Sequence, residues 1–218
     1  SYKLKIALIC HSDFSIAWSL EIFVKKLLLD NEVTVICDTH DHHEYGYYIE
    51  KAKKWGVQHK HVKTHRFISP YQDLKYLYTL YRILHNEHFD MVINIATKPN
   101  VYGSIAAYWA RVEKIVCFGW GLGFAFEKTK NIGRIALRYI MSALYRYSFK
   151  VSHKVWFTNK HDLDYLASKK IIDRSRKTYD SNLLIKQAEN FIFNKNNKKI
   201  KKIFDCRNPR DSVAEIFY

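Results

Sequence analysis

The sequence predicts an α/β fold, a Rossmann-like doubly wound sheet of about six mostly parallel strands. Short apolar runs rich in β-branched residues alternate with longer segments whose apolar residues recur at helical spacing. The chain has 218 residues, 48% hydrophobic and 26% charged, which suffices for one sizeable core and excludes a disordered chain. Strands separated by helices pair in parallel through right-handed crossovers, so an open sheet follows.

The predicted strands are apolar runs bounded by polar or turn residues. In chain order they are Leu4–Cys10, Glu32–Asp38, Val57–Val62, Met91–Ile95, Lys114–Phe118 and Lys154–Thr158. The helices between and after them are Ser15–Asp30, Glu44–Trp55, Pro70–Glu87, Asn100–Arg111, Ile132–Lys150 and Lys160–Ser168. Gly56 suits the end of the second helix, and Pro70 suits the first turn of the third.

Cysteine usage and hydropathy restrict the compartment. The four cysteines are widely spaced with no CxxC pair, which indicates buried thiols in a reducing compartment rather than a disulfide framework or zinc site. No apolar stretch reaches the roughly 20 residues of a membrane span, and the N-terminal apolar run is too short for a signal peptide. We therefore expect a cytoplasmic protein, at most peripheral to a membrane.

Ligands of doubly wound sheets bind outside the carboxyl ends of the strands, near the topological switch point. Ser12, Asp13, Phe14 and Ser15 follow the first strand, and they could cap the next helix. Asp13 could instead orient an acceptor hydroxyl as a base.

Two further segments follow later strands. Lys98 precedes a predicted helix, in which Pro99 suits the first turn and Asn100 can act as a cap. Its positive charge would add to a helix N-terminus that already favours anions, although a solvated lysine without a ligand is an equal alternative. Glycines alternate with large apolar residues from 119 to 124. This alternation would let backbone amides approach an anion or a sugar hydroxyl closely. The alternative is that the segment is only a flexible transition from strand to loop.

Histidine is plentiful between 40 and 65, yet no HExxH or paired cysteine spacing accompanies it, so surface histidines are favoured over a metal site. No GxSxG elbow is present, which argues against a hydrolase of that class.

The formal charge of +15 is concentrated in one region. Residues 131–178 contain eleven basic and three acidic residues, and no acidic residue lies between 131 and 161. The predicted helix 132–150 mixes aromatic and aliphatic residues with Arg134, Arg138, Arg146 and Lys150, which suits an anionic bilayer surface. The alternative is a packed crossover helix with snorkelling arginines. Nucleic acid is the other anionic candidate, but no RNP, zinc-finger or helix-turn-helix signature supports it.

Taken together, the strand-end segments resemble the N-terminal domain of bacterial family 4 glycosyltransferases, in the branch that builds lipid-linked oligosaccharides for lipopolysaccharide O-antigen, capsule or glycoprotein. The resemblance covers about residues 3–178. It rests on 6–15 at the first strand, on 98–104 (KPNVYGS) and 121–126 (GLGFAF) in this order, and on 154–162.

The resemblance implies one N-terminal half of a GT-B architecture. The complete enzyme would transfer a sugar from a nucleotide-sugar donor to a polyprenyl-diphosphate-linked saccharide, with retention of configuration and without an essential metal or other cofactor. The half seen here would hold the acceptor and dock on the inner face of the cell membrane. Asp13 would be catalytic, and the acceptor side of the cleft would comprise Ser12, Phe14, Ser15, Lys98, Asn100, Tyr102, Gly121, Gly123, Phe124 and Asn159.

The sequence also departs from the family pattern. No two glutamates are eight positions apart, residues 179–218 contain no glycine, and this segment has the character of a linker or degenerate tail. We therefore expect the donor domain to be missing and the chain alone to be inactive. Many relatives carry a histidine near the end of the fourth strand, where this chain has Asn94–Ala96. The alternative is a non-catalytic module of the same fold that binds an anionic lipid or polysaccharide as partner of another chain.

Overall fold

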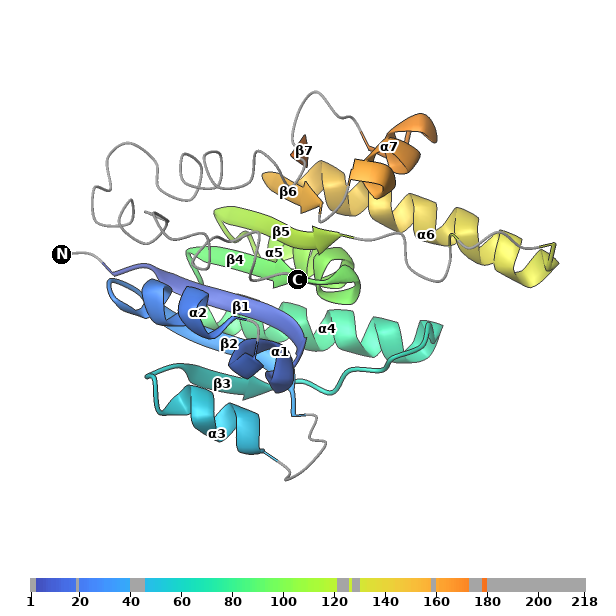
Figure 1. Cartoon of the computed structure of the whole chain (residues 1–218). Coiled ribbons are helices and arrows are strands. Elements are labelled where there is room, and N and C mark those ends of the chain that lie inside the picture. Colours follow the sequence, from blue (N-terminus) through green and yellow to red (C-terminus); the bar gives the residue numbers. More distant parts are fainter. Residues whose placement is uncertain are drawn as a thin grey trace.

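The computed structural model describes residues 3–18, 20–39, 46–120, 126, 130–157, 160–172 and 178–179. Their strands form one sheet in the order β3-β2-β1-β4-β5-β6-β7, in which every neighbouring pair is parallel (Figure 1). The strands are β1 (Lys5–Ser12), β2 (Glu32–Asp38), β3 (Gln58–His61), β4 (Met91–Ile95), β5 (Lys114–Trp120), β6 (Lys154–Phe157) and β7 (Thr178–Tyr179). This confirms the predicted doubly wound sheet, and the two-residue β7 is added at its edge.

Helices cover both faces of the sheet. They are α1 (Asp13–Trp18), α2 (Glu21–Leu28), α3 (Tyr47–Lys53), α4 (Pro70–Glu87), the π-helix η1 (Pro99–Gly103), α5 (Ser104–Trp109), α6 (Ile132–Val151) and α7 (Lys160–Ser168). One core lies between the sheet and α1 to α3, and the other between the sheet and α4, η1, α5, α6 and α7. Burial on both faces explains why the central strands are apolar runs without alternation.

Two predicted helices differ from the structure. The segment predicted as one helix from Ser15 to Asp30 forms α1 and α2, which meet near Leu20, and no proline or glycine marks that break. Ile16 and Leu20 are both fully buried, so each helix contributes its own anchor to the core. The segment predicted from Asn100 to Arg111 instead starts as η1, a wide turn of a kind often found at functional sites.

Glycine has a definite role at two places. Gly56 has a φ of +107° where the chain turns from α3 towards β3, but α3 ends at Lys53 with Lys54 as its C-cap, so Gly56 lies in the turn after the helix rather than at the predicted cap. Gly103 in η1 lies against the buried side chain of Asn94 on β4, and a Cβ there would overlap the Asn94 Oδ1 atom. The absence of a side chain at 103 is therefore what allows η1 to pack directly on β4.

Candidate functional site

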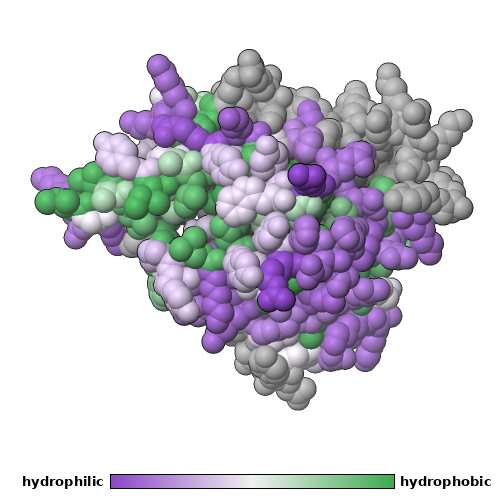
Figure 2. Space-filling model, turned by 180° about the vertical axis from the view of Figure 1, so that it is seen from behind, coloured by the Kyte–Doolittle hydropathy of each residue, from purple (hydrophilic) through white to green (hydrophobic). Residues whose placement is uncertain are grey.

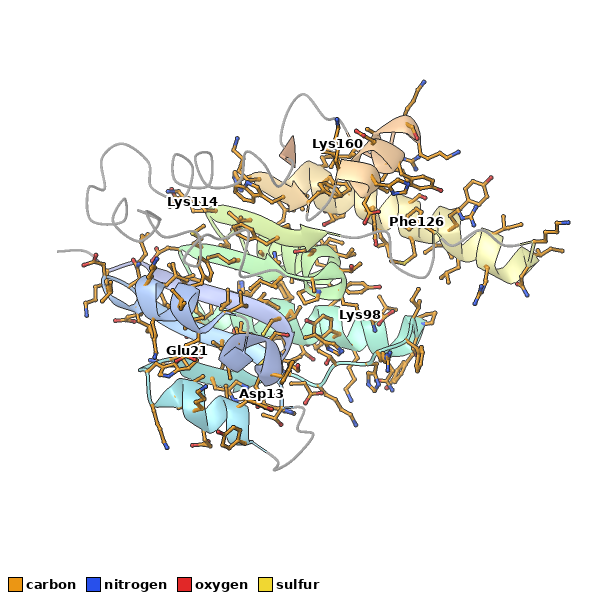
Figure 3. The ribbon with its side chains drawn as sticks, viewed as in Figure 1. Asp13, Glu21, Lys98, Lys114, Phe126 and Lys160 are labelled. Carbon is orange, nitrogen blue, oxygen red and sulfur yellow. The ribbon has the colours of Figure 1, made fainter. Side chains whose placement is uncertain are left out.

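The switch point of the sheet lies between β1 and β4, since the chain winds outward from these neighbours in opposite directions. The region outside their carboxyl ends, hereafter the crevice, is where ligands of such sheets bind and where the sequence places most of its candidate residues. Figure 3 shows Asp13 and Lys98 at this end of the sheet, on the segments that follow β1 and β4. The structure thus brings the two predicted segments to the same end of the sheet, although the side chains of Asp13 and Lys98 contact different neighbours.

Asp13 is fully buried at the start of α1. Its Oδ2 atom accepts a hydrogen bond of 2.9 Å from the backbone N of Ile49, which ties α1 to the first turn of α3. A carboxylate so placed holds two helices together, and a substrate would have to displace part of this packing to reach it. The catalytic role of Asp13 stays a prediction.

Lys98 is a structural anchor rather than a solvated lysine. Its Nζ atom donates to the carbonyl oxygens of His65 at 2.6 Å and Phe67 at 2.9 Å, and forms an ion pair of 2.7 Å with Asp73 Oδ1. An ammonium group has three hydrogens, so these partners match all of its donors. Asp73, which is buried, also accepts from the Ser69 backbone N at the start of α4. The acceptor-binding role of Lys98 stays a prediction and requires it to exchange one of these partners for the ligand.

Asn100 and Tyr102 point into the core from η1. Asn100 is fully buried, and its Nδ2 atom donates to the carbonyl oxygen of Phe118 at 2.7 Å, so its predicted capping role is wrong. Tyr102 packs edge-on against Tyr76 of α4. Burial raises the pKa of Tyr102, and the charge of Asp73 and a hydrogen bond to it raise it further. Both residues therefore fix η1 to its surroundings, and their predicted contact with an acceptor is not tested by this arrangement.

Ser12, Phe14 and Ser15 are partly exposed at the end of β1 and in α1. The ring of Phe14 packs edge-on against Tyr48 of α3 at 5.1 Å, so it is already engaged on the side away from β4. The two serines retain partial access to solvent at the crevice. The remaining predicted acceptor residues, Gly121, Gly123, Phe124 and Asn159, lie outside the described residues.

The chain turns sharply between β4 and η1 at Ala96. This residue has a φ of +72°, a left-handed conformation that side chains disfavour, and its backbone N donates to Phe118 O on β5. Strain of this kind persists where surrounding contacts hold the backbone, and it clusters at binding and catalytic sites. Ala96 and Thr97 therefore form a rigid rim at the carboxyl end of β4, next to the crevice.

Sequence reasoning missed a polar cluster that joins the ends of three strands. Asp38, at the end of β2, accepts from the Thr64 backbone N through Oδ2 at 3.0 Å, and its Oδ1 atom lies 2.9 Å from Nε2 of His61 on β3. The Thr64 hydroxyl donates to the carbonyl oxygen of His11 at 3.1 Å and lies 2.6 Å from His11 Nδ1. The single hydroxyl hydrogen can serve only one of these two acceptors at a time, so the direction of the shorter contact depends on the tautomer of His11. The cluster fixes the ring of His11 beside the switch point.

A signal for this cluster does exist in the sequence. Asp38 and His61 end neighbouring parallel strands, and the register pairs Cys37 with His61. The sequence alone suggests surface histidines, because it does not reveal which strands are adjacent. His40, His42 and His43 lie outside the described residues, and no group of three potential metal ligands occurs within the described ones.

The basic residues of α6 differ in their exposure. Arg134 and Arg138 precede Met141 and Tyr145 at helical spacing, so they share the face that is buried in the C-terminal half. Arg146 and Lys150 are exposed and lie towards the outward face of α6, although Arg146 also lies close enough to Arg138 to line the same hollow beside α7. This outward face also carries Ile132, Tyr139 and Ile140, whose side chains are 83%, 75% and 59% exposed.

The N-terminal half of α6 projects beyond the sheet (Figure 1). Seen from behind, this projection forms a mainly apolar area at the left of the molecule (Figure 2). In the part of the chain that the structure describes, no helix has the length and hydropathy needed to cross a bilayer. The predicted membrane contact of all four basic residues stays a prediction, and the structure leaves Arg146 and Lys150 more exposed than Arg134 and Arg138.

Comparisons with known proteins agree on the family. Residues 5–159 match the family model described as glycosyl transferase 4-like. The chain is 26% identical over 171 residues to N,N'-diacetylbacillosaminyl-diphospho-undecaprenol alpha-1,3-N-acetylgalactosaminyltransferase of Campylobacter jejuni. That match covers 76% of this chain and 43% of the relative, so the chain spans less than half of that enzyme's length.

Two solved structures illustrate the shared fold. A glycosyltransferase from Rickettsia africae aligns with a TM-score of 0.53 and 14% identity, over 90% of this chain and 51% of the other. A UDP-N-acetylglucosamine 2-epimerase from Rickettsia bellii aligns with a TM-score of 0.54 and 13% identity, over 88% and 49%. At such identities the likeness concerns the fold alone, and each match covers about half of the larger protein.

Proposed function

The chain belongs to the glycosyl transferase 4-like family, and from this premise we propose that it is the acceptor-binding half of a glycosyltransferase that acts on a polyprenyl-diphosphate-linked saccharide. The observation that carries the proposal is the family match over residues 5–159, which spans β1 to β6 and includes both segments at the switch point. The name of the Campylobacter jejuni relative supports a lipid-linked acceptor.

The proposed acceptor site lies at the carboxyl ends of β1 and β4. Ser12, Ser15 and Thr97 are partly exposed there and can bind sugar hydroxyls, while the polar cluster behind them orients His11. Lys98, Asp73 and Tyr102 hold the rim in place. The nucleotide-sugar donor would be bound by a second domain or a second chain, and the sugar would be transferred with retention of configuration and without an essential metal.

The first test is acceptor binding by the 218-residue chain, with a short-chain polyprenyl-diphosphate-linked N,N'-diacetylbacillosamine as probe. Titration calorimetry should show saturable binding. The double substitution Ser12→Ala/Ser15→Ala should weaken it about tenfold, because each lost hydrogen bond contributes roughly 0.5–1.5 kcal/mol. Ser168→Ala is the matched control, since that hydroxyl bonds the Tyr165 carbonyl oxygen on α7, away from the crevice.

Incubation with UDP-hexoses and UDP-N-acetylhexosamines tests the other half of the proposal. The chain alone should transfer no sugar to the probe, as measured by mass spectrometry of the lipid product. Efficient transfer by this chain would contradict its role as an acceptor half. An equal loss of binding in the Ser168 control would contradict the position of the site.

We further propose that the outward face of α6 rests on the inner surface of the cell membrane. Its N-terminal half exposes Ile132, Tyr139 and Ile140, and Arg146 and Lys150 follow on the same side. In an interfacial helix, apolar side chains enter the headgroup region and neighbouring cationic side chains contact anionic lipids. In this arrangement the apolar residues contribute most of the affinity, and the basic pair contributes a salt-sensitive part.

Co-sedimentation with vesicles of phosphatidylcholine and phosphatidylglycerol tests this contact. Ile132→Ser/Ile140→Ser should lower the partition coefficient between vesicle and solution about tenfold. Complete burial of an aliphatic side chain contributes roughly 1.5–3 kcal/mol, and burial at a membrane interface contributes less. The matched control is Ile22→Ser/Leu29→Ser, a pair also exposed but located on and just after α2 over the opposite face of the sheet. Equal losses in the two variants would reject α6 as the contact.

A non-catalytic module of the same fold is the second candidate. It is favoured by the burial of Asp13 and by the three partners of Lys98, which leave these groups engaged in structural contacts. This candidate binds an anionic lipid or polysaccharide as partner of another chain. Failure of the acceptor probe to bind, together with retained vesicle binding, would favour it over the acceptor half.

A further inference from the structure

A groove of about 530 Å³ lies along the outer surface of α4, next to the edge strand β3. Lys60 of β3 forms one side of it, and the face of α4 from Lys75 to Glu87 forms the other. In Figure 1, α4 lies behind the sheet, and β3 is the last strand at the lower edge. The groove is therefore bordered by one helix and a single strand.

Three cationic side chains reach this groove from the two elements. Lys75 and Arg82 are seven residues apart, which places them on one face of α4, about two helical turns from each other. Lys60 reaches the groove from β3, where successive side chains point to opposite faces of the sheet. Its neighbour His59 instead contacts Cys37, in the core on the other face. The helix and strand periodicities thus bring all three cations to one groove.

Of the described residues that line the groove, only Glu87 is acidic, and its charge is already shared. Its Oε1 atom lies 2.9 Å from Lys60 Nζ, and its Oε2 atom lies 3.3 Å from Lys5 Nζ. These two contacts lower the pKa of Glu87, so it is ionised at neutral pH. Lys75 and Arg82 form no ion pair within the described part of the chain. The groove therefore has an excess of positive charge that an anion would offset.

An exposed aromatic ring lies between the two cations of α4. Tyr78 follows Lys75 by three residues and precedes Arg82 by four, so the three side chains are neighbours on the helix surface. The Arg82 Cζ atom lies 6.0 Å from the centre of the Tyr78 ring, a distance at which a guanidinium is attracted to an aromatic face. The tyrosine is still 60% exposed, so much of its ring remains available to a flat ligand.

We propose that this groove binds a nucleoside diphosphate, either free or as part of a nucleotide sugar. The backbone positions of Lys75 and Arg82 are about 10 Å apart along the helix axis, which suits a chain of two phosphates better than a single phosphate. The guanidinium presents paired donors to phosphate oxygens, and the ammonium group adds a second charge. The base would stack on Tyr78, and the exposed amide of Asn86 can both donate to it and accept from it.

The size and position of the groove fit a whole nucleotide bound apart from the crevice. Pockets for small molecules measure about 300–1,000 Å³, a range that includes this groove. At one end of the groove Glu87 contacts Lys5, the first residue of β1, so this end lies at the amino ends of the strands. The crevice lies at their carboxyl ends, and the two share no lining residue. A failure of the acceptor assay therefore leaves this prediction intact.

The test is titration calorimetry of the 218-residue chain with UDP, ADP and inorganic pyrophosphate. Both nucleotides should bind, since every base offers a flat face to an aromatic ring, and pyrophosphate should bind at least fivefold more weakly. Lys75→Gln/Arg82→Gln should weaken nucleotide binding at least tenfold. The control Lys54→Gln/Lys169→Gln removes the same charge at exposed positions outside the groove and should stay within twofold of the original chain. Circular dichroism establishes that both variants keep their helices.

A tyrosine variant tests the stacking separately from the charge. Tyr78→Ala should weaken binding of UDP and ADP about fivefold and leave pyrophosphate binding unchanged. Tyr71→Ala is its matched control, because Tyr71 is 73% exposed on the same helix but does not line the groove. It should change neither affinity.

UDP-N-acetylglucosamine distinguishes the two sources of the ligand. An affinity similar to that of UDP would support the site and indicate a nucleotide sugar, whereas binding of UDP without the sugar nucleotide would support it and indicate a free nucleotide. Absence of saturable binding with both UDP and ADP, or equal losses in the two double variants, would overturn the proposal. Equal affinities for pyrophosphate and the nucleotides would also overturn it, because the groove would then attract anions without selecting a nucleoside.

Discussion

Replacement of Lys98 by methionine is expected to lower the free energy of unfolding by about 3–5 kcal/mol, because it leaves Asp73 buried without its cation. The substitution also removes the two hydrogen bonds that tie Lys98 to the carbonyl oxygens of His65 and Phe67. Urea denaturation followed by circular dichroism measures the change. In a protein of this size it corresponds to a fall of about 10 °C in the melting temperature.

Two further variants separate the ion pair from the loss of a long side chain. Lys75→Met is the matched control, since Lys75 is exposed on the same helix as Asp73, and it should change stability by less than about 0.5 kcal/mol. Lys98→Met/Asp73→Asn removes both charges and should recover more than half of the loss. If Lys98→Met is as stable as the Lys75 control, then Lys98 is not the anchor of this rim.

Replacement of Gly103 by alanine is expected to cost about 3 kcal/mol, a value at the upper end of what overpacking a core usually costs. The new Cβ would overlap Asn94 Oδ1, approach Asn94 Cγ to 2.8 Å and lie 3.3 Å from Ile9 Cδ1. Asn94 is fully buried on a central strand, so its amide has no open space to move into. The same denaturation measurement reports this change.

A compensating variant tests the cause. Asn94→Ala removes the atoms that the new methyl group would meet, so Gly103→Ala/Asn94→Ala should be more stable than the sum of the two single changes predicts, by about 1–2 kcal/mol. Gly133→Ala is the control, because a Cβ at that exposed helical position meets only Asn131 Oδ1 at 3.2 Å. Strictly additive losses would mean that contact with Asn94 is not what excludes a side chain at 103.

The two predictions concern one structural unit. Lys98 holds the loop before α4 and Gly103 lets η1 sit on β4, so together they set the shape of the rim at the carboxyl end of β4. A variant that changes the geometry of this rim is therefore expected to weaken acceptor binding at the crevice as well.

The amino-acid sequence determined the strands, their order along the chain and the parallel, doubly wound class. The apolar runs 91–95 and 114–118 match the core of β4 and β5, because a strand buried on both faces has to be apolar along its length. It also placed the candidate residues at strand ends, since that follows from local pattern and from the general rule for such sheets. The family resemblance drawn from those segments was confirmed by the family match.

Only the tertiary structure decided what the polar side chains contact. Lys98, Asp13 and Asn100 read alike in the sequence, as polar residues near helix starts, yet each meets a partner 18 to 36 positions away. The same holds for α6, whose basic residues form one series in the sequence, whereas in the structure Arg134 and Arg138 are partly buried and Arg146 and Lys150 are exposed. Hydrophobic periodicity is a local property that one segment reveals, whereas the partner of a charge depends on how distant segments pack.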